Sequence, residues 1–329
     1  MTQEAEAVQK PDVFERIRAA CRTVADRAEH VRICTDRIEA YAAALPIDEL
    51  AVPELDDERH FVGDESETVA YFVTLDALNF GSGYFPHLAK RPGMSGYYTI
   101  ASCLTDRYRA SGPIPAALLR TMSAPECGRL FAQDLKSFPI RELMGLFARA
   151  LNDLGAHLEA RFEGRFDRLV DAADRSAARL IEILSFQPFF RDEVSYRGLT
   201  VPLHKRAQLL ASDLALAFEG EGPGRFGDLD RLTIFADNLV PHVLRIDGLL
   251  EYSGDLGAAI EREDLIRAGS DEEIEIRACA VHCVELLRDA LARFGRSVPS
   301  RLLDQVLWHR GQGSTYKQRK RHRTRTVFY

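Results

Sequence analysis

Apolar residues recur at intervals of three and four along most of this 329-residue chain. This is the period of an amphipathic α-helix, and it restricts the possible folds more than any other feature of the sequence. The pattern predicts one or two helices over residues 12–45, and further helices at 140–162, 165–187, 205–220, 228–240, 270–295 and 298–311. We expect Asp228 or Asp230 to cap the start of the helix at 228–240, and Ser270 with Glu273 to form a capping box.

Signals for β-strands are few. The segment 68–80, "TVAYFVTLDALNF", has aromatic and β-branched residues in loose alternation, and "VSYRGLTVPL" predicts a hairpin that turns at Arg197 and Gly198. The fold class is therefore expected to be mostly α with a minor β element. Two candidate boundaries, 52–66 and 219–228, are too short to require two domains, so residues 1–329 are predicted to form one large helical domain.

Composition excludes several classes of function. The net charge of −7 disfavours a general nucleic-acid-binding protein, and the hydrophobic fraction of 46% can fill a sizeable core. No apolar run approaches the ~20 residues that cross a bilayer, and the N-terminus lacks an apolar signal core. We therefore expect a cytoplasmic protein without a membrane partner.

The six cysteines are scattered, which is typical of free thiols in a reducing compartment. One cluster, Cys279, His282 and Cys283, invites a zinc site, but no second pair of ligands stands at a usual spacing. Core packing on a helix is the favoured interpretation, and neither a metal nor a cofactor is predicted.

A loop-like stretch at residues 74–100 combines Asp76, Asn79, Phe80 and Ser82 with glycines and tyrosines. Glycine lets a ligand approach the backbone, amide and carboxylate groups form hydrogen bonds with it, and aromatic rings stack on flat molecules. The stretch therefore suits a planar heterocycle. An ordinary aromatic-rich loop over the core remains an equal alternative.

Two basic segments could hold an anion. Lys205 and Arg206 stand at the start of a predicted helix, where the helix dipole and free N–H groups favour a phosphate, although a solvated basic turn is the commoner outcome. The C-terminal segment "YKQRKRHRTRTVFY" is strongly basic but ends in apolar and aromatic residues. We expect this tail, residues 311–329, to fold back onto the body and to bring arginines toward anionic partners.

Asp237 lies in the apolar segment "RLTIFADNLVPHVLRIDG". A carboxylate in such surroundings costs free energy unless it is paired or useful. It could cap a helix C-terminus or pair with an arginine of the tail. Together with a loop for a planar base and a basic site for a phosphate, it could instead stabilise the oxocarbenium-like sugar that forms when a nucleotide loses its base.

Four stretches in the same order, "LDALNFGSGYF", "HKRAQLLASDL", "LTIFADNLVPHVL" and "RHRTRTVFY", resemble the queuosine salvage protein family. Members of that family are queuosine 5′-phosphate N-glycosylases, which hydrolyse the nucleotide and release the base queuine. The resemblance implies a fold similar to that of helix-hairpin-helix DNA glycosylases, with the N-terminal helices of residues 1–50 placed before the resembling region.

The resemblance also implies roles for individual residues. Asp237 would be the catalytic carboxylate, Lys205 would meet the 5′-phosphate, and Asn79 and Phe80 would lie at the base. We extend the expected base site to Asp76, Ser82, Phe235 and Asn238. The expected phosphate site contains Lys205, Arg206, His322, Arg323, Arg325 and Tyr329.

Two other functions remain open at this point. The chain could be a glycosylase-like module that binds tRNA or DNA through its basic tail, although its acidity disfavours this. It could also be a helical scaffold without activity. The enzyme hypothesis predicts a mononucleotide substrate and no stable nucleic-acid complex.

Overall fold

The computed structural model describes residues 11–47 and 55–329, and most of these residues are helical, which confirms the predicted mostly α fold class. The first elements are α1 (Val13–Arg27), β1 (Val31–Ile33), η1 (Thr35–Arg37) and α2 (Ile38–Ala44). They are followed by α3 (Glu65–Ala77), η3 (Ser82–His87), α4 (Gly96–Ser111), α5 (Ala116–Leu119), α6 (Ala124–Leu130), α7 (Phe138–Phe162), α8 (Phe166–Asp171) and α9 (Ala177–Leu184).

The second half of the chain begins with a hairpin. Its elements are β2 (Glu193–Tyr196), β3 (Leu199–Pro202), α10 (Lys205–Ala217), η4 (Gly222–Gly224), η5 (Leu229–Arg231), α11 (Val240–Ile246), β4 (Leu250–Tyr252), α12 (Gly254–Glu261), α13 (Asp271–Arg293), α14 (Ser300–Gly311) and α15 (Ser314–Lys317). No helix of the described ranges is long and apolar enough to cross a membrane.

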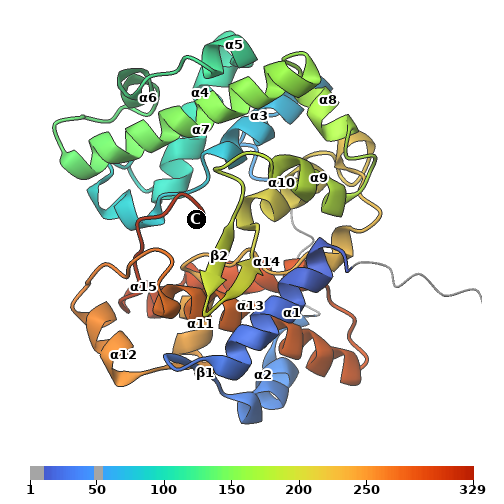
Figure 1. The fold of residues 1–329 in the computed structure, drawn as a ribbon, viewed down its shortest axis with the longest axis vertical. Coiled ribbons are helices and arrows are strands. Elements are labelled where there is room, and N and C mark those ends of the chain that lie inside the picture. Colours follow the sequence, from blue (N-terminus) through green and yellow to red (C-terminus); the bar gives the residue numbers. More distant parts are fainter. Residues whose placement is uncertain (1–10, 48–54) are drawn as a thin grey trace, which may run out of the picture.

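The helices gather in two groups, as Figure 1 shows. One group contains α3 to α8 and is built around the long helix α7, which packs against α5 and α6. The other contains α1, α2 and α11 to α15 and is built around α13, against which α1 and α2 pack. Helix α10 packs against α3 and α9, and the C-terminal segment runs between the two groups (Figure 1).

The predicted helix start at residue 270 is present, but the capping box is only half formed. The side chain of Ser270 caps α13 by accepting a hydrogen bond from the N–H of Glu273. The Glu273 carboxylate reaches one residue further back than predicted, and accepts from the N–H of Gly269 at 3.2 Å.

Two segments were predicted as the wrong type of element, and the helix predicted at 165–187 is divided into α8 and α9. The segment 68–80 is not a strand, because most of it belongs to helix α3. Every residue of α3 from Thr68 to Ala77 is buried, so the helix is covered on all sides and lacks the exposed polar face that would have revealed its period. The segment 228–240 is not a helix either: after the short η5 it has an irregular backbone up to α11.

The position of Asp228 explains part of the second error. Instead of capping a helix of its own segment, it accepts hydrogen bonds from the backbone N–H groups of Ala177 (2.6 Å) and Ala178 (3.1 Å), at the start of α9. The N–H groups that a helix would use are also bound from outside the segment. Those of Thr233 and Phe235 donate to side chains on α10 and α14.

The predicted hairpin is confirmed. Strands β2 and β3 pair in antiparallel fashion, and both turn residues, Arg197 and Gly198, have positive φ, as a tight two-residue turn requires. A second antiparallel pair, β1 with β4, was not predicted. It divides the segment 12–45 into the two helices α1 and α2.

The C-terminal tail returns to the body of the protein. The N–H of Ile266 donates to the carbonyl of Arg323 at 2.8 Å, and the N–H of Gly81 donates to Tyr329 at 2.9 Å. Gly83 lies so close to the carbonyl of Thr324 that a Cβ atom would collide with it. Glycine at position 83 therefore lets the tail enter between the two groups of helices. The single-domain organisation stays a prediction.

Candidate functional site

A cavity of about 700 Å³ lies where α10, α14, the irregular segment before α11 and the tail meet. One face of α10 forms a wall of it, through Lys205, Leu209, Ser212, Asp213 and Leu216. Their spacing of four, three, one and three residues is that of a single helix face.

Asp237 lies in this cavity and is half-buried. Its Oδ1 accepts hydrogen bonds from the backbone N–H groups of Leu239 (2.7 Å) and Val240 (3.3 Å), at the start of α11. Oδ2 takes part in neither bond. The carboxylate is thus fixed at a helix N-terminus, not at the C-terminus or on an arginine, and one of its oxygens remains for a ligand.

The backbone directly before Asp237 is held by side chains of three helices. Gln208 of α10 accepts from the N–H of Thr233 at 2.9 Å, and Asp304 of α14 accepts from the N–H of Phe235 at 2.8 Å. The carbonyl of Ala236 accepts from Nε of Arg277, on α13, at 2.9 Å. Asp237 therefore sits on an irregular but firmly anchored segment.

Lys205 is the first residue of α10, and its side chain is buried in the same cavity. Its Nζ lies 3.4 Å from Oδ1 of Asn79, and its backbone N–H donates to Asp192 at 3.1 Å. Burial lowers the pKa of Lys205, and the carboxylates of Asp237 and Asp76 act in the opposite direction. The ammonium group and Asp237 therefore interact electrostatically inside the cavity.

Most residues expected at the base line this cavity: Asn79, Phe80, Ser82, Phe235 and Asn238. Asp76 does not line it. It is fully buried on α3 and accepts a hydrogen bond of 3.2 Å from Nδ2 of Asn79. Its position is thus behind Asn79 and not among the residues that line the cavity.

Arg206, expected at the phosphate, points away from the cavity. Its guanidinium donates to the backbone carbonyls of Asp76, Ala77 and Phe189. It also stacks between the rings of Phe80 and Phe190, at 4.9 and 4.8 Å from their centroids. The guanidinium is thus held by backbone carbonyls and aromatic rings, which indicates a structural role for Arg206.

The tail residues expected at the phosphate also differ in whether they line the cavity. Tyr329 lines the cavity, whereas the buried His322 does not. Arg323 donates to the carbonyl of Glu263 at 2.6 Å, and Arg325 pairs with Glu142 at 3.7 Å. Three other cations of the tail region are exposed and line the cavity: Lys317, Arg319 and Arg321.

Aromatic side chains form much of the remaining wall, which includes Phe72, Phe85, Tyr97, Tyr98 and Trp308. The rings of Tyr98 and Trp308 meet edge to face at 6.3 Å. His60 and Tyr97 are joined by a hydrogen bond of 2.9 Å between Nε2 and the hydroxyl. A carboxylate, a buried ammonium, aromatic walls and a cationic rim suit a nucleotide with a flat base.

Comparison with known proteins agrees with this chemistry. The model of the family described as "Queuosine salvage protein" matches residues 59–329. The chain belongs to this family. It is 36% identical to the queuosine 5′-phosphate N-glycosylase/hydrolase of Sphaerobacter thermophilus over 94% of this chain and 96% of that protein.

Two further relatives of the queuosine salvage family carry the same name. The protein of Mus musculus is 31% identical over 81% of this chain and 83% of its own length. That of Dictyostelium discoideum is 31% identical over 80% of this chain and 78% of its own length.

Sequence reasoning missed two acids of this family member's cavity. Burial, and then the charge of Asp237, raise the pKa of Asp304 on α14 to about 7. Asp213 lies on α10, eight residues after Lys205, and its pKa is raised well above the usual range by burial. Both stand on correctly predicted helices. The spacing from Lys205 to Asp213 was the signal that could have placed the second acid in the site.

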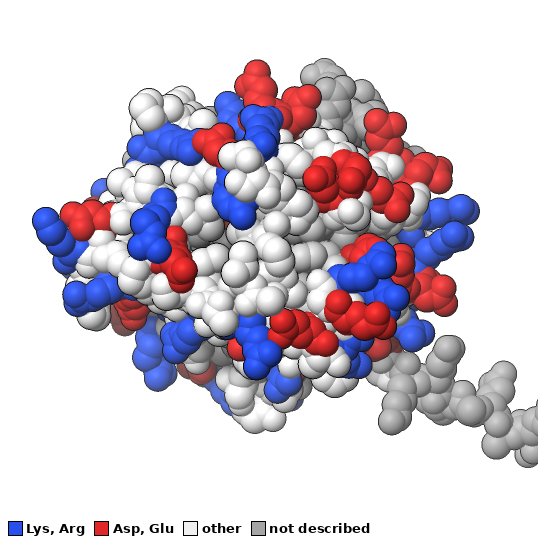
Figure 2. Space-filling model, turned by 90° about the horizontal axis from the view of Figure 1, so that it is seen from above, with Lys and Arg blue, Asp and Glu red and all other residues white. Residues whose placement is uncertain are grey.

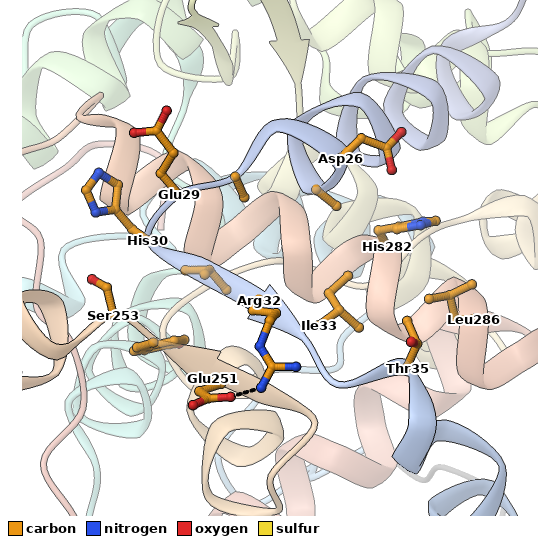
Figure 3. A pocket seen from close by; sticks show the side chains of 14 residues that line it. Asp26, Glu29, His30, Arg32, Ile33, Thr35, Glu251, Ser253, His282 and Leu286 are labelled. Atoms are coloured by element: carbon orange, nitrogen blue, oxygen red, sulfur yellow. Dashed lines mark hydrogen bonds and ion pairs between the residues drawn. The ribbon is translucent and has the colours of Figure 1, made fainter.

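A second pocket, of about 460 Å³, lies between α1, the β1–β4 pair and α13. Figure 3 shows its charged side chains spread around it, with an ion pair between Arg32 and Glu251. His282 lines this pocket, whereas Cys279 and Cys283, also on α13, are buried in the hydrophobic core of the protein. None of the predicted site residues lines it, and no group of three potential metal ligands occurs in the described ranges.

Proposed function

We propose that this chain hydrolyses the N-glycosidic bond of queuosine 5′-phosphate and releases queuine. The observation that carries the proposal is the position of Asp237. One oxygen of its carboxylate is anchored to two backbone N–H groups, and the other oxygen takes part in neither bond. The cavity around it also contains a buried lysine and aromatic walls. The name shared by the family relatives supports the same substrate.

At the sugar, Asp237 would face the anomeric carbon. Positive charge develops there as the base departs, and a fixed carboxylate stabilises that charge without having to reorganise. Asp237 could also capture the carbon or activate water. Lys205 would balance the negative charge that Asp237 and the bound phosphate bring into the cavity.

At the base, Asn79, Phe80, Ser82, Phe235 and Asn238 would contact the 7-deazaguanine ring, because they line the same cavity as Lys205 and Asp237. Asp76 would act through Asn79, whose amide it orients. A flat ring gains dispersion energy against aromatic walls and leaves its edges to polar groups.

For the phosphate, the structure favours a set of cationic residues that differs from the set expected from the sequence. Lys317, Arg319 and Arg321 line the cavity and are exposed, whereas Arg206, Arg323 and Arg325 have protein partners. We propose that the first three bind the 5′-phosphate. Tyr329 would close the cavity beside them, and His322 would support the tail from within the core.

The central test replaces Asp237 with Asn. Asparagine keeps an oxygen for the N–H groups of Leu239 and Val240, so the fold should persist while the charge is lost. We expect queuine release to fall by roughly a thousandfold, as for other fixed groups that stabilise a transition-state charge. Asp230→Asn, an exposed residue paired with Arg301, is the matched control. Turnover near the wild-type rate in Asp237→Asn would refute the assignment.

Action on a polynucleotide is the alternative. The face in Figure 2 carries acidic and basic side chains side by side, not one continuous basic surface. Duplex binding depends on many phosphate contacts and weakens steeply with salt, whereas a single phosphate gives a shallow dependence. Binding of tRNA with a steep salt dependence would favour the alternative. Likeness to helix-hairpin-helix DNA glycosylases and a cytoplasmic location stay proposals.

A further inference from the structure

Asp213 occupies a distinct part of the cavity. It lies on the same face of α10 as Lys205, eight residues further along, which places it about 12 Å away along the helix axis at 1.5 Å per residue. Ser212 and Leu216 line the cavity beside it. A substrate that fills the cavity from Asp237 and Lys205 to Asp213 would place its far end beside Asp213.

The carboxylate of Asp213 is half-buried at the wall of the cavity. Within residues 11–47 and 55–329, no hydrogen bond to the Asp213 carboxylate is found, and only charges and burial act on it. Oδ2 of Asp76 is buried and has no partner in that part of the chain, whereas Asp213 is only half-buried. The Asp213 carboxylate, which faces the cavity, can therefore accept a hydrogen bond from a ligand.

Tyr97 adds a further acceptor. Nδ1 of His60 lies 2.9 Å from the carbonyl oxygen of Asp56, so this nitrogen must carry the proton. Nε2 of His60 is then an acceptor, and the Tyr97 hydroxyl donates its proton to it. The oxygen of Tyr97 keeps only its lone pairs for a ligand.

The charges at this end of the cavity favour a positively charged group on the ligand. Burial raises the pKa of Asp213, and the carboxylate of Asp76 raises it further, while Lys205 acts in the opposite direction. Neutral N–H donors would satisfy the hydrogen bonds but would leave the ionised forms of the two carboxylates disfavoured. A positively charged group on the ligand would satisfy both.

We propose that Asp213 binds the protonated amine of the substituent on carbon 7 of the queuosine base, and so selects nucleotides that carry a positive charge there. This inference rests on the proposed function. The guanine-like edge of the base offers only neutral donors, whereas the aminomethyl substituent is an ammonium near neutral pH. Asp213 is thereby a specificity-determining residue, separate from Asp237 and Lys205.

The test compares three substrates: queuosine 5′-phosphate, its 7-aminomethyl counterpart, which is also cationic, and its 7-cyano counterpart, which is neutral. Wild-type protein and Asp213→Asn are assayed for kcat and KM on each. Asp26→Asn, an exposed residue of the second pocket, controls for the change in net charge. A thermal unfolding curve for each variant shows that the chain is folded.

We expect Asp213→Asn to lose about tenfold or more in kcat/KM on both cationic substrates, mainly through KM, and to retain the wild-type value on the neutral one. The control should match the wild type on all three. An equal loss on all three substrates would overturn the proposal, because Asp213 would then read the part of the base that they share. If the wild-type protein releases no base from any of them, the proposed function fails instead.

Discussion

Nε of Arg277 donates a hydrogen bond of 2.9 Å to the carbonyl of Ala236, the residue directly before Asp237. The same guanidinium forms two hydrogen bonds with Asp192, at 3.0 and 2.6 Å, and lies 4.6 Å from the centre of the Tyr329 ring. Asp192 in turn accepts from the N–H of Lys205. One buried side chain therefore connects the segments that carry Asp237, Lys205 and the C-terminal tyrosine.

Replacing Arg277 with Met should both destabilise the protein and disturb the site. Asp192 would be left as a buried carboxylate without its main partner, which typically costs about 3–5 kcal/mol. Chemical denaturation measures this loss. Arg293→Met is the control, because its pair with Glu39 is exposed and contributes at most about 1 kcal/mol. Equal stability of the two variants would contradict the connecting role of Arg277.

Lys205→Met should separate catalysis from stability. Removing a buried ammonium relieves its desolvation cost, so the variant should remain folded, with a change in unfolding free energy within about 2 kcal/mol. Asp237 would lose its cationic neighbour, and we expect kcat for queuosine 5′-phosphate to fall by about a hundredfold or more. Lys136→Met, on the surface, should change neither quantity. A Lys205→Met variant with normal kcat would remove Lys205 from the proposed mechanism.

The helices that frame the site could be predicted because their apolar spacing is local. Lys205 stands at the start of a predicted helix, and Asp304 lies within another. The segment that carries Asp237 could not be predicted, since its backbone N–H groups donate to Gln208 and Asp304, residues distant in the chain. Local spacing therefore suggested a helix where long-range hydrogen bonds fix an irregular backbone.

The direction of a side chain was also beyond local reasoning. Lys205 and Arg206 are adjacent and both basic, yet α10 turns the first into the cavity and the second toward the carbonyls of Asp76 and Ala77. Successive helical residues point about 100° apart. Which of the two faces the ligand is decided by the packing of α10 against α3.

Neutralising the exposed cations of the rim should affect binding of the nucleotide but not of the nucleoside. In the triple variant Lys317→Gln, Arg319→Gln, Arg321→Gln, we expect KM for queuosine 5′-phosphate to rise by about tenfold or more, because charge-assisted hydrogen bonds to the phosphate are lost. Turnover of queuosine, which has no phosphate, should be unchanged.

The matched control for this variant neutralises tail arginines that have protein partners. Arg323→Gln, Arg325→Gln should alter stability more than the preference for the phosphate, since these residues contact Glu263 and Glu142. A larger loss of phosphate preference in the control than in the triple variant would restore the assignment expected from the sequence.

His322 should make the anchoring of the tail sensitive to acid. Its ring is buried, neither nitrogen has a hydrogen-bond partner in the described ranges, and burial followed by nearby cations lowers its pKa from 6.5 to about 3. Between these values the unfolded chain binds a proton that the folded chain does not, so stability falls as pH drops, by on the order of 1 kcal/mol per pH unit. His322→Phe cannot titrate, and its stability relative to the wild type should rise steadily below pH 6.5 in denaturation experiments. His87→Phe, at an exposed histidine, is the control for the substitution, and a curve for His322→Phe that is parallel to the wild type would show that His322 does not couple the tail to pH.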